Sequence, residues 1–260
     1  MLPTMLVILT IALLYWFPIR RWMSGWGTVP SDLVRVMAGD ALLPNHTYSG
    51  TMAVIVDTPP EHIWPWLVQM GYKRGGLYSY DWLDRLFGFL DRPSASRILP
   101  EFQHLSVGDA IPLGRGPSWP VAVIEPCRAL VLDMRNTGAV DWVWQFGLYP
   151  VDEKRTQLVS RSRVRAHDVW GRLLTSAIEP AGFVMTRQML LGLKQRAERL
   201  QSSAPVGDDL LPNASARAAH HVATKDAPIS CSSSTPSAAP VSAGGVVNAV
   251  SAGGAIITAG

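Results

Sequence analysis

The chain has 260 residues, a net charge of +3 and 48% hydrophobic residues, so it can hold one large domain or two small ones. Its basic residues are scattered, and no aromatic residues alternate with a basic run, which disfavours nucleic-acid binding. Its two cysteines, Cys127 and Cys231, lie far apart, so we expect neither a disulfide nor a zinc site.

An almost unbroken apolar run, Leu2 to Ile19, opens the chain, and Arg20 and Arg21 close it. Its length lies at the short end of what spans a bilayer, and tryptophans flank its end, as they do at membrane interfaces. A cleaved signal peptide is the alternative, but no basic residue precedes the run and bulky residues follow it. A buried N-terminal helix fits less well, because the run has no polar face. We therefore expect residues 1–25 to form a membrane anchor, with the domain on the cytoplasmic side.

The next part of the chain predicts one strand and two helices. The segment 51–57 has the composition of a strand. Thr58 can cap a helix that follows it, and Gly71 suits the left-handed residue at the end of that helix. A shorter helix over 82–87 should end at Gly88, because its apolar residues have helical spacing.

A strand-rich half follows these helices. The segment 107–113 predicts a strand, and 121–125 with 129–135 predicts a hairpin. The segments 141–149 and 155–165 alternate between apolar and polar residues, which is typical of strands with one buried face.

The last predicted strand has two unlike faces. Arg161, Arg163 and Arg165 share one face, which we interpret as a solvated outer face. The opposite face carries Ser160 and Ser162, whose small side chains leave room instead of filling it.

Apolar residues at helical spacing from Leu173 to Leu200 predict one long helix, with a kink at Pro180. Beyond it the aromatics stop and Ala, Ser, Gly and Pro dominate, so residues 201–260 are expected to be a disordered tail. Residues 26–200 are then one domain. A strand, two helices, antiparallel strands and a final helix make an α+β fold with the helices on one sheet face.

The segment from Trp64 to Asp84 is rich in aromatic residues, which suits a wall that contacts a bulky apolar ligand. Arg74 precedes the flexible Gly75-Gly76 pair and is the expected polar anchor for a carboxylate or phosphate. The serine face would leave volume, and methionines of the last helix would supply adaptable apolar surface. The candidate ligand-binding residues are Trp64, Trp66, Arg74, Tyr78, Tyr80, Asp81, Trp82, Ser160, Ser162, Met185 and Met189.

Several motifs between residues 26 and 200 together resemble one known family. They are Trp26-Gly27-Thr28, Gly39-Asp40, Pro59-Pro60-Glu61, the run Trp64 to Gly71, Arg74-Gly75-Gly76, Tyr78 to Leu83, Arg97 to Glu101, Val107-Gly108-Asp109, Glu179-Pro180, Phe183-Val184-Met185, Met189-Leu190, Gly192 and Lys194. With this order of elements, they resemble the helix-grip fold of the SRPBCC (START/Bet v 1-like) superfamily, and more closely a bacterial membrane-associated subgroup of it.

The resemblance implies a curved sheet that grips the C-terminal helix around an internal cavity. Members of the superfamily bind lipids, sterols, polyketides or hormones, and some catalyse cyclisation or dehydration. For the membrane-associated subgroup the resemblance implies no reaction. The first hypothesis is therefore a membrane-tethered protein that binds a hydrophobic small molecule or lipid.

The alternative is a polyketide cyclase/dehydrase-like or hydrolytic enzyme that uses the same cavity. Its acid–base and anchoring groups would be Arg74, Tyr78, Tyr80 and Asp81, supported by Glu101 or Asp109. The chain has no complete nucleophile or metal set, P-loop or dinucleotide fingerprint, so binding comes first and no cofactor or metal is expected. A scaffold whose own side chains fill the cavity is a third possibility. An enzyme should place two or more titratable groups deep in the pocket, and a carrier one polar anchor in an apolar pocket.

Overall fold

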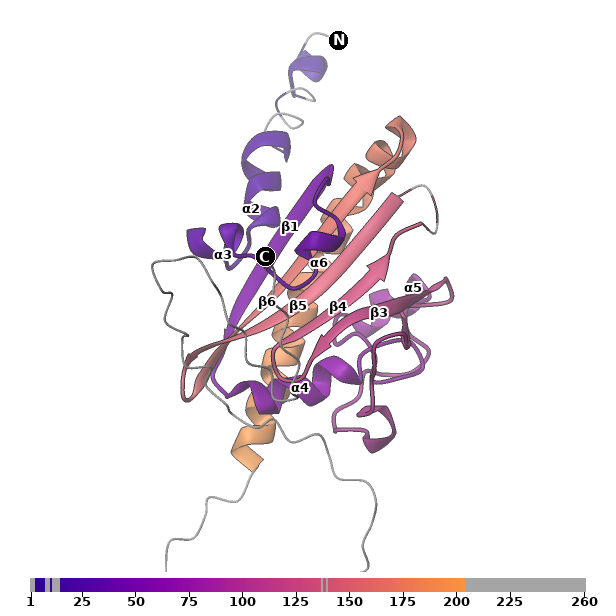
Figure 1. Ribbon diagram of the computed structural model, residues 1–260. Coiled ribbons are helices and arrows are strands. Elements are labelled where there is room, and N and C mark those ends of the chain that lie inside the picture. The colour runs from indigo at the N-terminus through magenta and orange to yellow at the C-terminus, as the bar shows by residue number, and fades with distance from the viewer. Residues whose placement is uncertain (1–2, 8–9, 11–14, 137, 139, 204–260) are drawn as a thin grey trace, which may run out of the picture.

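The structure is a computed structural model, which describes the chain except residues 1–2, 8–9, 11–14, 137, 139 and 204–260 (Figure 1). The helices are η1 (Tyr15–Ile19), α2 (Arg20–Ser24), α3 (Pro30–Val34), η2 (Asp40–Leu42), α4 (Pro60–Val68), α5 (Asp81–Leu86), η3 (Pro100–Phe102) and α6 (Val169–Ser203). The strands are β1 (Tyr48–Val56), β2 (Ala110–Pro112), β3 (Ser118–Glu125), β4 (Ala129–Met134), β5 (Val140–Asp152) and β6 (Arg155–Ala166).

The strands form one six-stranded sheet in the order β1-β6-β5-β4-β3-β2, with every neighbouring pair antiparallel. The expected hairpin is present as β3 and β4, and the two alternating segments are present as β5 and β6. The alternation of β5 separates two covered faces: Trp142, Trp144 and Phe146 belong to the main core, whereas Asp141, Val143 and Gln145 are buried on the other face. The strand expected over 107–113 is shorter, and only Ala110–Pro112 pairs as β2.

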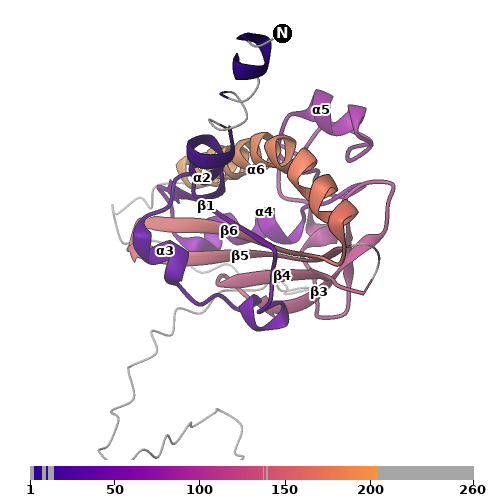
Figure 2. The same ribbon diagram turned by 90° about the horizontal axis from the view of Figure 1, so that it is seen from above.

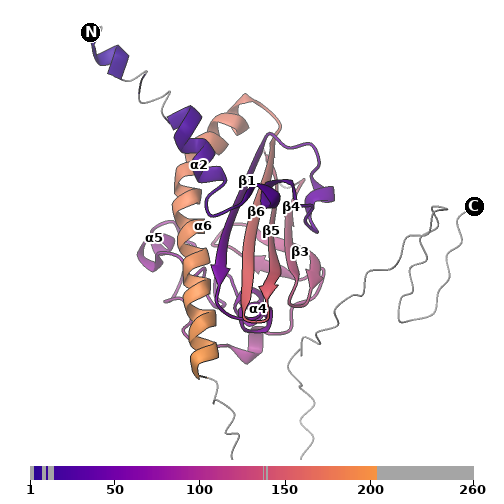
Figure 3. The same cartoon turned by 90° about the vertical axis from the view of Figure 1, so that its left-hand side faces the viewer.

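The long helix α6 runs across one face of the sheet, with α4 on the same side (Figures 2 and 3). Seen from above, α3 and the connection to β1 lie on the opposite face (Figure 2). The main core fills the space between the sheet and the helices, with Trp64, Leu67, Phe146, Leu158 and Leu190 among its buried residues. A six-stranded antiparallel sheet with a long C-terminal helix is an α+β architecture that fits the helix-grip fold, as the sequence predicts.

The outer arginine face of β6 differs from the expectation at Arg161, which is buried, whereas the side chain of Arg165 is 41% exposed. Arg161 is only 2% exposed, and its guanidinium pairs with Asp40 at 2.7 Å. The same guanidinium donates to the carbonyls of Asp32 and Arg35 and to the hydroxyl of Thr51. The segment that contains α3 and η2 covers this face, and the paired carboxylate and carbonyls offset the cost of burying the charge.

The N-terminal end of the domain is made of short helical pieces. Within the residues that the structure describes, no helix is both long and apolar enough to cross a membrane. The expected anchor falls partly on residues 1–2, 8–9 and 11–14, which lie outside this description. Its last turns contact the domain, since the rings of Trp22 and Phe183 are 5.2 Å apart.

Three local details also differ from the sequence prediction. The cap of α4 is Pro59 without a side-chain hydrogen bond, while the Thr58 hydroxyl pairs with the ring of His62 at 2.8 Å. Cys127 is disulfide-bonded, so the expectation of an unpaired cysteine there is wrong; Cys231 lies outside the described residues. The helix α6 continues to Ser203, three residues into the predicted tail, and the rest of that tail also lies outside the description.

Candidate functional site

A cavity of about 240 Å³ lies between the sheet and α6. Strands β3, β5 and β6 form its floor, α6 forms its roof, and α5 with the neighbouring loops closes one side. Its lining residues are Leu77, Ser79, Asp84, Phe89, Leu113, Trp119, Trp142, Trp144, Ser162, Gly182, Met185, Thr186 and Met189.

Three tryptophans dominate the floor of the cavity. The ring of Trp119 on β3 lies edge-on to those of Trp142 and Trp144 on β5, at centroid distances of 5.1 and 6.0 Å. Such tilted contacts are the favoured geometry of aromatic pairs. The alternation of β5 places both of its tryptophans on the face that meets α6, whereas Trp119 belongs to β3, where it pairs with Ile111 of β2.

The serines of β6 have a more specific role than leaving space. The indole nitrogen of Trp142 donates to the hydroxyl of Ser162 at 3.2 Å, and that of Trp144 donates to Ser160 at 2.9 Å. These diagonal contacts between neighbouring strands fix both indole rings against the sheet. Small hydroxyl side chains therefore satisfy the polar edge of each indole and leave its apolar face toward the cavity.

The roof of the cavity comes from one face of α6. Met185 and Met189 supply flexible apolar surface, and Thr186 lies between them in the sequence. Gly182 lies at the exposed side, where an added Cβ would meet no heavy atom of the described residues within 4 Å. The roof therefore has unfilled space at Gly182, one turn before Met185.

Asp84 is the ionisable residue in this lining. Its side chain belongs to α5, and the residue is 0% exposed although Trp82 on the same helix is 67% exposed. The hydroxyl of Ser79 donates to its Oδ1 at 3.1 Å. Its Oδ2 is buried and has no hydrogen-bond partner among the described residues. Burial raises the pKa of this carboxyl from 3.8 to about 6, while the Ser79 hydrogen bond opposes the rise.

A buried carboxylate oxygen without a partner is costly, and native structures supply such atoms with a donor in nearly all cases. Asp84 can therefore accept a hydrogen bond from a hydroxyl or amine of a ligand in the cavity. With a pKa near neutrality, it can also exchange a proton with such a group.

Sequence reasoning missed Asp84, because the segment 82–87 was recognised only by the helical spacing of its apolar residues. The structure turns the helix the other way: Trp82, Leu86 and Phe87 are exposed and Asp84 faces inward. Helical spacing groups the residues of one face, but it does not say which face meets the sheet. No signal in the sequence separates Asp84 from Asp81 as the inward carboxyl.

Three of the predicted ligand-binding residues line the cavity, namely Ser162, Met185 and Met189. Ser160 lies beneath the floor, where it is buried and holds the indole of Trp144. The other seven predicted residues do not line this cavity.

The aromatic block lies mainly in the core beside the cavity. Trp64 and Trp66 are buried, and the ring of Trp66 meets that of Tyr78 edge-on at 6.0 Å. The hydroxyl of Tyr78 donates to the carbonyl of Trp66 at 3.1 Å, which ties the two segments together. The block therefore packs mainly against its own side chains, and its exposed member is Trp82.

The polar members of the block hold loops in place. Asp81 accepts hydrogen bonds from the backbone and the hydroxyl of Ser94 at 3.1 and 2.7 Å, and Tyr80 precedes it at the start of α5. Asp109 accepts from the backbone of Ser106 at 2.8 Å, which closes a turn. Glu101 is exposed in η3.

Arg74, the expected anchor, is held by backbone carbonyls. Its guanidinium donates to Met70 at 3.1 Å and to Val68 at 2.8 Å, and it lies 4.6 Å from the ring centroid of Phe102. The loop that carries it closes where Gly71 and Gly76 pair, and Gly76 has a φ of +85°, which favours glycine. The structure thus does not bring Arg74 together with Asp84 at the cavity.

No protein-family profile matches the chain, and no curated protein sequence matches it. Among solved structures, the chain is similar to a protein from Thermobifida fusca, with 15% identity, 59% of this chain and 95% of that chain covered, and a TM-score of 0.38. It is also similar to the Zhui aromatase/cyclase from Streptomyces sp. R1128, with 16% identity, 61% and 98% covered, and a TM-score of 0.35. A third similar structure is CalU16 from Micromonospora echinospora, with 16% identity, 59% and 86% covered, and a TM-score of 0.30.

Proposed function

We propose that this chain is an SRPBCC-like protein that binds a hydrophobic small molecule or lipid in the cavity under α6. The observation that carries the proposal is an apolar cavity, walled by Trp119, Trp142 and Trp144, that contains one buried carboxyl with an unpartnered oxygen. Ligand sites of this kind combine apolar walls with a few placed polar groups. Asp84 would accept a hydrogen bond from the ligand, and the tryptophans and methionines would cover its apolar part.

The volume of the cavity limits the size of the ligand. About 240 Å³ lies slightly below the range of roughly 300–1,000 Å³ that is common for drug-sized ligands. We expect a compact molecule, or one end of a longer lipid whose remainder leaves by the open side at Gly182. Rotation of Met185 or Met189 would enlarge the cavity at small cost, because methionine has three rotatable bonds.

Binding is favoured over catalysis by the composition of the lining. Asp84 is the ionisable side chain among the described residues of the cavity wall, whereas acid–base catalysis on a bound substrate commonly uses an acid and a base. The second candidate remains a cyclase/dehydrase-like or hydrolytic enzyme. It is favoured by one observation, the pKa of about 6 at Asp84, which suits proton transfer near neutral pH.

Gly182 allows a test that changes the cavity with little disturbance of the fold. Gly182→Leu adds a side chain into open space at the cavity, and Gly182→Ala is the matched control that improves helix propensity without filling it. Native mass spectrometry of the purified full chain, followed by solvent extraction, should find ligand in the wild type and the Ala variant and little in the Leu variant. Equal occupancy in all three proteins would reject this cavity as the binding site.

The extracted ligand also distinguishes a carrier from an enzyme. The extracted ligand is incubated with fresh wild-type protein or with Asp84→Asn, and its mass and chromatographic retention are then compared. A carrier returns the ligand unchanged from both proteins, and Asp84→Asn lowers its occupancy. An enzyme returns an altered molecule from the wild type alone.

The membrane tether is a separate part of the proposal, supported by the apolar run from Leu2 to Ile19. Arg20 and Arg21 after the run favour a cytoplasmic domain, whereas the disulfide at Cys127 is typical of an oxidising compartment. Alkaline carbonate extraction should leave the full chain in the membrane pellet if the run is an anchor. A reporter enzyme fused after Ser203 then decides the side, and activity confined to the outside would exclude the cytoplasmic orientation.

A further inference from the structure

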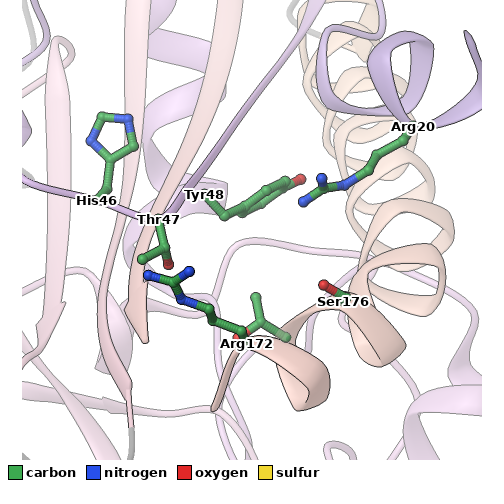
Figure 4. Close-up of a pocket in the computed structure, with 7 residues that line it drawn as sticks. Arg20, His46, Thr47, Tyr48, Arg172 and Ser176 are labelled. Atoms are coloured by element: carbon green, nitrogen blue, oxygen red, sulfur yellow. The ribbon is translucent and has the colours of Figure 1, made fainter. Parts of the chain in front are cut away.

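A second pocket, of about 380 Å³, lies where the N-terminal segment meets the first turns of α6 (Figure 4). It shares no lining residue with the cavity under α6. Its wall includes the side chains of Arg20, His46, Thr47, Tyr48, Arg172 and Ser176. All of these can donate hydrogen bonds, and none is acidic. Such a lining is complementary to an anion with several oxygen atoms.

The two arginines enter the pocket from different elements. Arg20 comes from α2, and its Nε donates to the buried carboxylate of Glu179 at 2.8 Å. Its guanidinium lies beside the ring of Tyr48 (Figure 4), 5.6 Å from the ring centroid. Arg172 comes from α6 and extends toward Thr47 (Figure 4). Glu179 therefore fixes Arg20 and balances one positive charge.

Arg172 supplies the positive charge of the pocket that Glu179 does not balance. Within the part of the chain that the structure describes, its guanidinium has no hydrogen-bond or ion-pair partner, and the residue is exposed. Asp168 lies one turn earlier, where its carboxylate accepts the backbone N–H of Gly171 at the start of α6. Thr175 also lines the pocket, and its hydroxyl donates a hydrogen bond to the carbonyl of Gly171. An arginine fork left open in this way matches phosphate geometry.

Large apolar side chains are exposed around the same end of the domain. Phe17 and Trp22 are exposed in η1 and α2, and Trp170, Leu173 and Leu174 are exposed in the first turns of α6. These two segments lie at one end of the molecule in both side views (Figures 1 and 3). Exposed aromatics beside basic residues are typical of protein surfaces that enter the interface of an anionic membrane.

We propose that this pocket binds the phosphate of an anionic membrane lipid, with Arg172 as the main contact and the apolar rim inserted among the lipids. The inference rests on the proposed membrane tether for the direction of approach, and it does not depend on the ligand of the internal cavity. The apolar rim favours a lipid over free phosphate, because a dissolved ion gains nothing from exposed apolar side chains, whereas acyl chains and glycerol cover them.

The test uses the full chain, purified in a non-ionic detergent at low ionic strength. Isothermal titration calorimetry compares short-chain phosphatidic acid, short-chain phosphatidylcholine and inorganic phosphate. Arg172→Gln removes the charge at the pocket. The matched control is Lys154→Gln, which removes one exposed positive charge from the turn between β5 and β6, at the other end of the sheet.

We expect phosphatidic acid to bind more tightly than phosphate, and phosphatidylcholine to bind weakly. Arg172→Gln should weaken phosphatidic acid binding about tenfold or more, because it removes charge-assisted hydrogen bonds, and Lys154→Gln should leave it unchanged. Equal affinities for phosphate and phosphatidic acid would overturn the lipid as the source of the phosphate. Equal losses in both variants, or no binding of either anion, would overturn the site.

Failure of this proposal is distinguishable from failure of the proposed function. Cavity occupancy in the same preparations is measured by native mass spectrometry, and the tether by carbonate extraction, and neither measurement depends on Arg172. Circular dichroism spectra that superimpose for Arg172→Gln and the wild type show that a loss of binding is not a loss of folding.

Discussion

The buried carboxyl of Asp84 at the cavity should make the stability of the protein depend on pH. Burial raises the pKa of its carboxyl from 3.8 to about 6, and a rise of this size corresponds to about 3 kcal/mol. The side chain faces a cavity with an open side, so solvent screening reduces the effect to about 1–2 kcal/mol. Since the folded pKa is the higher one, this stabilising contribution is fully present below about pH 4. It is lost as the pH rises through about 6.

The variant Asp84→Asn cannot ionise and therefore isolates this contribution. The unfolding free energy of the wild type minus that of Asp84→Asn should fall by about 1–2 kcal/mol between pH 4.5 and pH 7.5. For a domain of this size, the difference in melting temperature should change by about 2–8 °C. Urea unfolding followed by circular dichroism at a series of pH values measures the difference directly.

The control for this experiment is Asp152→Asn. Asp152 is exposed, and a hydrogen bond from Arg155 lowers the pKa of its carboxyl, so its contribution is present at neutral pH and lost in acid. The corresponding difference for Asp152 should therefore rise with pH and not fall. Parallel stability profiles for the wild type and Asp84→Asn would show that Asp84 is solvated, and they would refute its role as a buried group at the cavity.

Three further substitutions test the fold around the cavity. Arg161→Met should lower the stability by about 3 kcal/mol, because it leaves the buried Asp40 carboxylate without its closest cation, and differential scanning calorimetry would detect this. Gly192→Ala should destabilise by about 1–3 kcal/mol, since the new Cβ would be too close to the carbonyl oxygen of Tyr78; a melting temperature equal to the wild type would contradict this contact. Arg74→Ala should cost about 1–3 kcal/mol through lost bonds to backbone carbonyls and leave ligand occupancy in native mass spectra unchanged. A loss of ligand without a loss of stability would instead restore Arg74 as the anchor.

The local pattern of the sequence determined those elements that carry a regular repeat of apolar residues. The alternation of residues 141–149 predicted β5, because successive side chains of a strand point to opposite faces. The helical spacing from Leu173 to Leu200 predicted α6 for the same kind of reason. Two of its methionines, Met185 and Met189, line the cavity.

The tertiary structure alone decided which faces are covered and which polar groups meet. Arg161 has the sequence signature of a solvated strand face, but a segment more than a hundred residues earlier covers it and supplies Asp40 as its partner. The orientation of α5, which buries Asp84 and exposes Trp82, depends on the loops that hold it and not on its own periodicity. A sequence pattern reports the period of burial along one element, whereas the free energy that buries a charge comes from residues distant in the chain.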